Sequence, residues 1–211
     1  MGLSLYREYY HKNLDRNETM VEQRKINVFH GTFIEITNDI LVNGFQYKHN
    51  KKHWLGQGFY FYTDFYLAKW WSEKKVEFEK QEKNNEYNPS VINADIIANT
   101  DNILNLDFPK ELDCFLDFIK DYMKQMADNN IVINFDRTKV EETRCFFLDI
   151  MKKEKNIFVI IRTFDKESPS YGKFDLRTLP MEIELGLKYN ETQICVTRNS
   201  VIFNKKCVYP E

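Results

Sequence analysis

The chain has 211 residues, and 43% of them are hydrophobic, which is enough to build the core of a single domain. Its 30 basic and 32 acidic side chains give a net charge of -2, so the chain as a whole has no electrostatic drive toward nucleic acid or a membrane surface. The four cysteines are widely spaced and include no C-x-x-C pair, a pattern that argues against a disulfide framework or a zinc site and favours the reducing cytoplasm.

The first part of the chain predicts a strand, a short helix, a second strand and a long helix. Residues 1–25 are polar with scattered aromatics, a composition that is interpreted as a helical arm packed on the domain. They show neither the apolar core of a signal peptide nor a run long enough for a membrane span. A strand at residues 27–31 precedes an amphipathic helix that ends at Gly44, because glycine commonly closes a helix. Residues 56–63 predict a strand entered through two glycines, and Asp64 is the expected N-cap of the next helix.

The rest of the chain predicts two more helices and five more strands. Pro109 in the first turn and apolar residues at helical spacing predict a long helix, and residues 140–153 predict another. The strands are short apolar runs bounded by turn residues, at 89–97, 101–107, 156–164, 191–197 and 199–209. Because the strands are short and separated, with helices between the early ones, the predicted class is α+β.

Three strands carry polar or aromatic groups that a plain core strand does not need: FHGT at residues 29–32, GQGFYF at 56–61 and ETQICV at 191–196. Each motif alone has an ordinary interpretation, such as a satisfied core histidine or a glycine-rich hairpin entry. In this order, over residues 26–208, they resemble the ADP-ribosyltransferase superfamily, in the branch related to diphtheria toxin and the poly-ADP-ribose polymerases, whose motifs carry His, Tyr and Glu. The chain looks closest to a group of bacterial ADP-ribosyltransferase-like domains of unassigned function.

The resemblance implies a fold and a co-substrate. The fold is a split β-sandwich of two small sheets flanked by helices, formed by residues 26–211 behind the arm at 1–25. The cleft between the sheets would bind NAD, whose cationic nicotinamide is already a good leaving group, so the implied chemistry needs no metal. The implied reaction is mono-ADP-ribosylation of a macromolecule, or NAD hydrolysis, with release of nicotinamide.

The first two motifs then acquire roles in holding NAD. The resemblance implies that His30 hydrogen-bonds a ribose and that the backbone of Gly31 grips the nicotinamide carboxamide, where a bare glycine allows close approach. Thr32 completes the motif and is counted with these cofactor-binding residues. In the second motif, Gly58 belongs to the G-x-G-x-Y-F pattern and Tyr60 packs against the nicotinamide.

The following helix and the third motif complete the implied site. Trp71 stands where the family often has a second stacking aromatic, while Ala68 replaces a serine that bonds the carboxamide in many relatives. The family's glutamate, which bonds the ribose and stabilises positive charge in the transition state, aligns with Gln193. Glu191 lies two residues earlier on the same strand face and restores carboxylate chemistry if it reaches the ribose instead. The sequence leaves both alternatives open.

Two segments are candidates for contacts with the acceptor. Lys51 and Lys52 lie in a basic loop that would attract a phosphate or another anion at short range, although a solvated loop is as good an interpretation. The loop before the last strands often presents the acceptor in the family, and residues 165–184 stand in that place, with Tyr171 and Arg177 as candidate contacts.

The resemblance implies a macromolecular acceptor, protein or nucleic acid, and allows for a cognate inhibitor or antitoxin as a partner, in a toxin, a defence system or an effector. One alternative is a degenerate transferase fold that acts only as a nucleotide- or protein-binding module. Another is an enzyme that modifies nucleic acid through the basic loop at 48–53.

Overall fold

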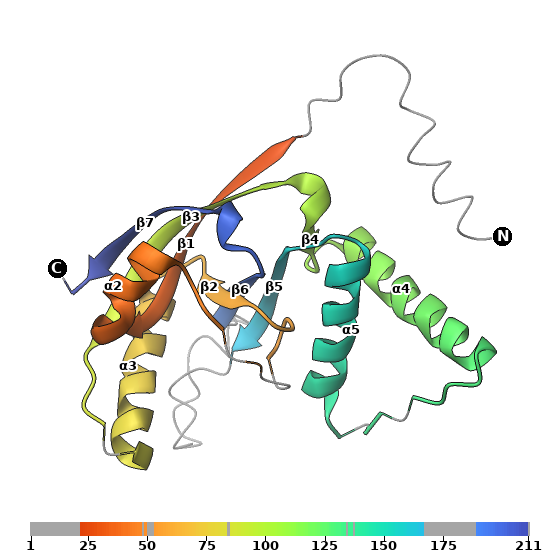
Figure 1. Cartoon of the computed structure of the whole chain (residues 1–211), viewed down its shortest axis with the longest axis horizontal. Helices are drawn as coiled ribbons and strands as arrows, with labels where there is room; N and C mark the ends of the chain where they lie inside the picture. Colours follow the sequence, from red (N-terminus) through yellow and green to blue (C-terminus); the bar gives the residue numbers. More distant parts are fainter. Residues whose placement is uncertain are drawn as a thin grey trace, which may run out of the picture.

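The computed structural model describes residues 22–47, 49, 53–83, 85–133, 135–136, 138–166 and 189–210, and these form an α+β fold of one mixed sheet and four α-helices (Figure 1). The strands are β1 (Gln23–Phe33), β2 (Phe59–Tyr62), β3 (Pro89–Asn99), β4 (Ile103–Asn105), β5 (Val159–Lys166), β6 (Tyr189–Val196) and β7 (Ile202–Tyr209). The helices are α2 (Ile34–Asn43), α3 (Phe65–Lys83), α4 (Pro109–Asp128) and α5 (Val140–Glu154), with short 3-10 turns at Thr100–Asn102 and Asn199–Val201.

The strands form one sheet in the order β4-β5-β6-β2-β1-β3-β7, in which β4 and β5 are parallel and all other neighbours are antiparallel. The halves β4-β5-β6-β2 and β1-β3-β7 are joined by a single residue pair, Phe29 with Tyr62. The prediction of two separate small sheets is therefore wrong as stated. β1 pairs with β3 along its whole length, but β2 has only four residues and follows β6 instead, so the sheet is nearly parted between β1 and β2.

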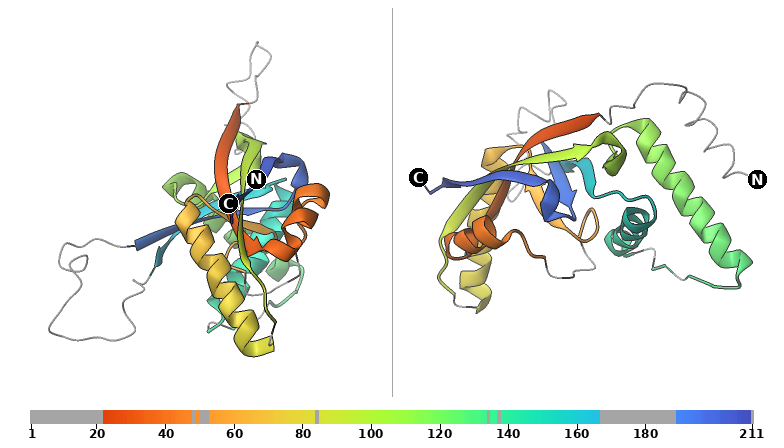
Figure 2. Two further views of the ribbon diagram at one scale, coloured as in Figure 1. Left: turned by 90° about the vertical axis from the view of Figure 1, so that its left-hand side faces the viewer. Right: turned by 45° about the horizontal axis from the view of Figure 1, so that its top comes forward.

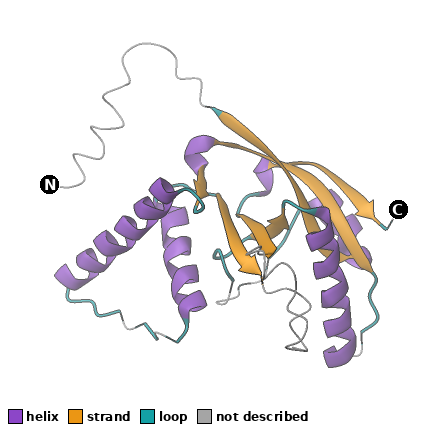
Figure 3. Ribbon diagram, turned by 180° about the vertical axis from the view of Figure 1, so that it is seen from behind, coloured by secondary structure: helices purple, strands orange, loops and turns teal. Residues whose placement is uncertain are grey.

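Apolar side chains pack on both faces of the sheet. One face packs against α2 through residues such as Val28 and Ile40. The opposite face carries two clusters, one under α4 and α5 around Ile160 and one under α3 around Ala68. Figure 3 shows the pair α4 and α5 at one end of the sheet and the pair α2 and α3 at the other, and Figure 2 shows α3 running beside β1 and β3. A sheet whose halves are covered by different helices can leave a site where the halves part.

Local signals set the helix ends that the sequence predicts. Gly44 closes α2 with a φ of 87°, and its N–H donates to the carbonyl of Ile40 at 3.0 Å. The Asp64 carboxylate accepts a hydrogen bond from the N–H of Leu67 at 3.0 Å at the start of α3. Both predicted caps are confirmed, as are the helix beginning at Pro109 and the helix over residues 140–153.

The boundary of the predicted arm needs a correction. β1 begins at Gln23, which pairs with Asn99 at the end of β3, so residues 23–25 are strand and not helix. They extend the sheet because β3 offers a partner over its full length. Residues 1–21 lie outside the described residues. Within the described ranges, no helix is both long enough and apolar enough to cross a membrane.

Candidate functional site

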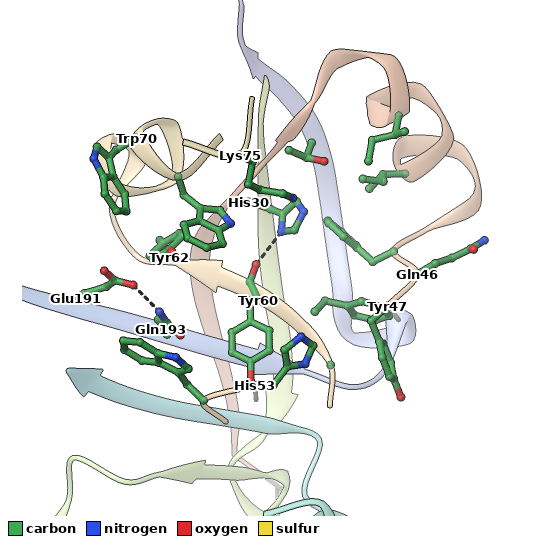
Figure 4. A pocket seen from close by; sticks show the side chains of 18 of the residues that line it. His30, Gln46, Tyr47, His53, Tyr60, Tyr62, Trp70, Lys75, Glu191 and Gln193 are labelled. Atoms are coloured by element: carbon green, nitrogen blue, oxygen red, sulfur yellow. Dashed lines mark hydrogen bonds between the residues drawn. The ribbon is translucent and has the colours of Figure 1, made fainter. Parts of the chain in front are cut away.

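A pocket of about 960 Å³ lies where β1 and β2 part from each other (Figure 4). Its aromatic lining consists of Phe45, Tyr47, Trp54, Phe59, Tyr60, Tyr62, Trp70, Trp71 and Phe164. Its polar lining consists of His30, Thr32, Gln46, His49, His53, Lys75, Glu191 and Gln193. Aromatic walls with a small number of converging polar groups are typical of a site for a small molecule.

His30 lies where β1 and β2 separate, and a hydrogen bond to the neighbouring strand fixes its ring. Its Nδ1 lies 2.7 Å from the backbone oxygen of Tyr60, and because a carbonyl only accepts hydrogen bonds, Nδ1 carries the proton. Burial, together with the positive charge of Lys75, lowers the pKa of His30 to about 4 against the opposing effect of the bond to Tyr60. The imidazole is therefore neutral near pH 7, and its Nε2 has a lone pair that can accept a hydrogen bond from a ligand hydroxyl.

Gly31 and Ala68 meet at a packing contact. A Cβ at Gly31 would lie 2.1 Å from the backbone oxygen of Ala68, so α3 can lie this close to β1 only where the strand has a glycine. Ala68 is fully buried, and neither residue belongs to the described lining of the pocket. The glycine of the first motif thus has a packing explanation that is independent of the carboxamide role implied for it.

Thr32 does line the pocket, two residues after His30 on β1. Its side chain is 1% exposed, and its hydroxyl oxygen has no hydrogen-bond partner among the described residues. Native proteins satisfy most buried hydroxyls, since an unsatisfied one costs roughly 1–3 kcal/mol. A ligand in the pocket is one partner that would remove this cost.

Tyr60 is held by its hydroxyl as well as by its strand. The hydroxyl donates to the backbone oxygen of Gly56 at 2.7 Å and accepts from the N–H of Leu55 at 2.7 Å. Its ring lies 5.1 Å from the ring of His53 in an edge-to-face contact, with both rings in the pocket lining. Burial raises the pKa of Tyr60, so the phenol stays protonated near pH 7. Tyr60 therefore supplies a rigid aromatic wall, and its hydroxyl is used by the protein itself.

A polar network around the buried Lys152 supports the glycine-rich turn before β2. Lys152 of α5 is 8% exposed, donates to the backbone oxygen of Gln57 at 2.7 Å and pairs with Asp149 at 3.2 Å. Asp149 in turn accepts from the N–H of Gln57 at 2.7 Å. A Cβ at Gly58 would lie 2.6 Å from the sulfur of Cys195, so β6 packs closely under the turn. Gly58 lines the pocket, and the network fixes the backbone on which it sits.

Two of the pocket residues from α3, Trp71 and Lys75, lie one helical turn apart. Trp71 is 43% exposed and lines the pocket, as the stacking role implied for it requires. Lys75 is partly buried and lies next to His30 in the pocket (Figure 4). Burial lowers the pKa of Lys75. The spacing of four residues puts both side chains on the same helix face.

Glu191 and Gln193 both reach the pocket from one face of β6. They are 7% and 9% exposed, and the Gln193 amide donates to the Glu191 carboxylate at 2.5 Å. Burial, the charge of Glu191 and a hydrogen bond to it raise the pKa of the Tyr62 hydroxyl. The two alternatives for the third motif are thus parts of one hydrogen-bonded unit, with a carboxylate that an amide and a phenol orient (Figure 4).

The candidate acceptor contacts cannot be placed. Lys51 and Lys52 of the basic loop, and Tyr171 and Arg177 of the loop before β6, lie outside the described residues. Across the ranges that are described, no group of three or more His, Cys, Asp and Glu side chains is arranged to hold a metal ion.

Among the pocket residues that the sequence does not predict are Tyr62, Lys75 and the pair Trp54 and Phe164. The rings of Trp54 and Phe164 pack edge to face at 4.7 Å in the pocket lining. Tyr62 could have been found, because it lies two residues after Tyr60 on the same strand. Lys75 could have been found from its position one helical turn after Trp71. Trp54 and Phe164 come from segments far apart in sequence, and nothing in either segment indicates the contact.

A scan against protein-family models, a search of curated proteins and a search of solved structures found no match to this chain. The fold and the site define an α+β protein with an aromatic pocket between two half-sheets.

Proposed function

We propose that the chain is an NAD-dependent ADP-ribosyltransferase that uses the pocket between β1 and β2 to transfer ADP-ribose to a macromolecule or to water. The observation that carries the proposal is the convergence of three chemically different groups on one pocket. They are the neutral imidazole of His30, the oriented carboxylate of Glu191 and the exposed indole of Trp71. The resemblance of the three sequence motifs to this superfamily supports the same assignment.

Each group has a task in breaking the bond between nicotinamide and ribose. As this bond breaks, its electron pair leaves with nicotinamide, and positive charge develops on the ribose. Glu191 supplies a negative charge in a buried position, where electrostatic stabilisation is stronger than in water. His30 accepts a hydrogen bond from a ribose hydroxyl through Nε2, and Trp71 stacks on a flat ring. The acceptor hydroxyl, amine or water then bonds to the ribose carbon and loses its proton.

Glu191 is preferred to Gln193 as the group that faces the developing charge. A neutral amide can bond a ribose hydroxyl but cannot offset positive charge as a carboxylate does. Gln193 donates to Glu191 and so orients it, which gives the amide a role that does not require it to replace the carboxylate. This assignment fits the second of the two alternatives for the third motif.

The test is release of nicotinamide from NAD, followed by chromatography, with the full chain alone and with protein and nucleic-acid mixtures as acceptors. Label from the adenosine part of NAD that becomes attached to a macromolecule separates transfer from hydrolysis. Trp71→Ala should lower the rate, while Phe78→Ala, an aromatic that is 56% exposed on the same helix and does not line the pocket, should not. If no condition releases nicotinamide but the chain binds NAD in calorimetry, the binding-module alternative takes the place of the enzyme.

A further inference from the structure

Lys75 differs from the other lysines of α3 in its surroundings. Lys69, Lys74 and Lys83 each have a glutamate within 4 Å on the same helix. The fourth, Lys80, has no such partner among the described residues but is exposed to solvent. Lys75 lies in the pocket lining, and no carboxylate of a described residue lies within 4 Å of its ammonium group. Glu79, one turn further on, is engaged with Lys83 at 2.7 Å. A cation without a close counter-ion thus faces a pocket.

The position of this ammonium group is unfavourable without a ligand. Burial lowers the pKa of Lys75, because a charge removed from water is disfavoured unless it is compensated, and the charge of Glu79 offsets this only in part. The ammonium lies 5.1 Å from the centroid of the Phe33 ring, a contact weaker than an ion pair. His30 beside it is neutral near pH 7 and gives no negative charge. An anionic group of a ligand would supply the missing compensation.

Thr32 provides a second, independent sign of a ligand at the same pocket. Its hydroxyl is buried without a partner among the described residues, and it lines the pocket together with His30 and Lys75. A hydroxyl and an ammonium are both donors, and phosphate oxygens accept from both. A neutral nucleoside would leave the ammonium uncompensated.

We propose that Lys75 and Thr32 form an anion subsite of the pocket that takes a phosphate group of a nucleotide. This inference rests on the proposed function in one respect only, since NAD would supply the phosphates there as its pyrophosphate. It predicts that the site binds phosphorylated nucleotides more tightly than nucleosides or nicotinamide alone. It also adds a binding residue from α3 that the three sequence motifs do not include.

The experiment measures binding of ADP and of adenosine to the full chain by calorimetry, at low and at raised salt concentration. The wild type should bind ADP more tightly than adenosine, and salt should weaken only the binding of ADP. Lys75→Met keeps the aliphatic stem over Phe33 and should weaken ADP binding about tenfold or more, because it removes a charge-assisted hydrogen bond. Its effect on adenosine should be small.

Three further variants separate the subsite from general effects on folding. Lys75→Arg keeps the charge and should retain most of the ADP affinity. Lys74→Met removes an exposed lysine from the same helix and should change nothing. Thr32→Val should weaken ADP binding while the variant remains as stable as the wild type or becomes more stable.

Several results would overturn the subsite. These are equal affinity of the wild type for ADP and adenosine, no detectable binding of ADP, or wild-type ADP affinity in a folded Lys75→Met chain. Failure of the anion subsite can be told apart from failure of the proposed transferase function. If ADP binds through Lys75 but NAD is never cleaved, the subsite stands and the transferase falls. If NAD is cleaved while ADP affinity does not depend on Lys75, the transferase stands and the subsite falls.

Discussion

Thr32 and Thr37 form a natural pair for testing whether the pocket holds an unsatisfied hydroxyl. Both side chains are 1% exposed. Thr37 donates to the backbone oxygen of Phe33 at 2.9 Å and bonds the Ser90 hydroxyl at 2.9 Å. Thr32 has no partner among the described residues. Replacing each threonine by valine exchanges a hydroxyl for a methyl group in the same degree of burial.

The expected effects on stability have opposite signs. Thr32→Val removes an unpaired buried hydroxyl, whose desolvation costs roughly 1–3 kcal/mol, so the free energy of unfolding should rise by about 1 kcal/mol. For a chain of this length, that corresponds to a rise in Tm of about 2–4 °C. Thr37→Val breaks two hydrogen bonds and leaves the Ser90 hydroxyl with one hydrogen-bond partner fewer, so the free energy of unfolding should fall by about 1–3 kcal/mol.

Urea denaturation of the two variants and the wild type, without ligand, gives the comparison. The m-value must stay constant for the midpoints to report stability alone. The reasoning is refuted if Thr32→Val loses as much stability as Thr37→Val, because the Thr32 hydroxyl would then be bonded within the free protein.

Three further predictions concern packing, the buried network and pH. Gly31→Ala should lower the free energy of unfolding by about 3 kcal/mol, because the Cβ of the new alanine would collide with the backbone oxygen of Ala68. An almost unchanged free energy of unfolding in urea denaturation would show that α3 is not packed this closely against β1. Lys152→Met should cost about 2 kcal/mol, since it leaves the partly exposed Asp149 without its buried partner; an unchanged midpoint would contradict the network. Between pH 6.5 and about 4, the unfolded chain takes up a proton on His30 that the folded chain does not. The free energy of unfolding should therefore fall with falling pH more steeply in the wild type than in His30→Gln. Equal pH dependence of the free energy of unfolding in the two chains would disprove the lowered pKa of His30.

Much of the secondary structure could be predicted because its signals are local. Periodicity, the glycine cap at Gly44 and the carboxylate cap at Asp64 place the helices within a few residues. The joining of the strands into one sheet could not be predicted in the same way. It depends on a single long-range pair, Phe29 with Tyr62, and strand pairing is decided by contacts across the chain and not by local pattern.

The candidate site also has features that could be predicted from the sequence and features that could not. The period of two along a strand puts Glu191 and Gln193 on one face, so their joint position in the pocket follows from the sequence. The packing role of Gly31 does not, because it requires knowing that α3 crosses β1 at that residue. The lack of a close counter-ion at Lys75 could not be predicted either, since the lysines of α3 cannot be told apart by sequence until their ion-pair partners are known.

The central claim is that Glu191 is the carboxylate with which this pocket cleaves NAD. The most direct measurement is the rate of nicotinamide release from NAD by the wild type, by Glu191→Gln and by Gln193→Ala, each shown to be folded by its thermal transition. The account predicts release by the wild type, a loss of about a hundredfold or more in Glu191→Gln, and a smaller loss in Gln193→Ala, which keeps the charge but not its orienting amide. A rate in Glu191→Gln equal to that of the wild type, or no release by the wild type under any condition, would contradict it.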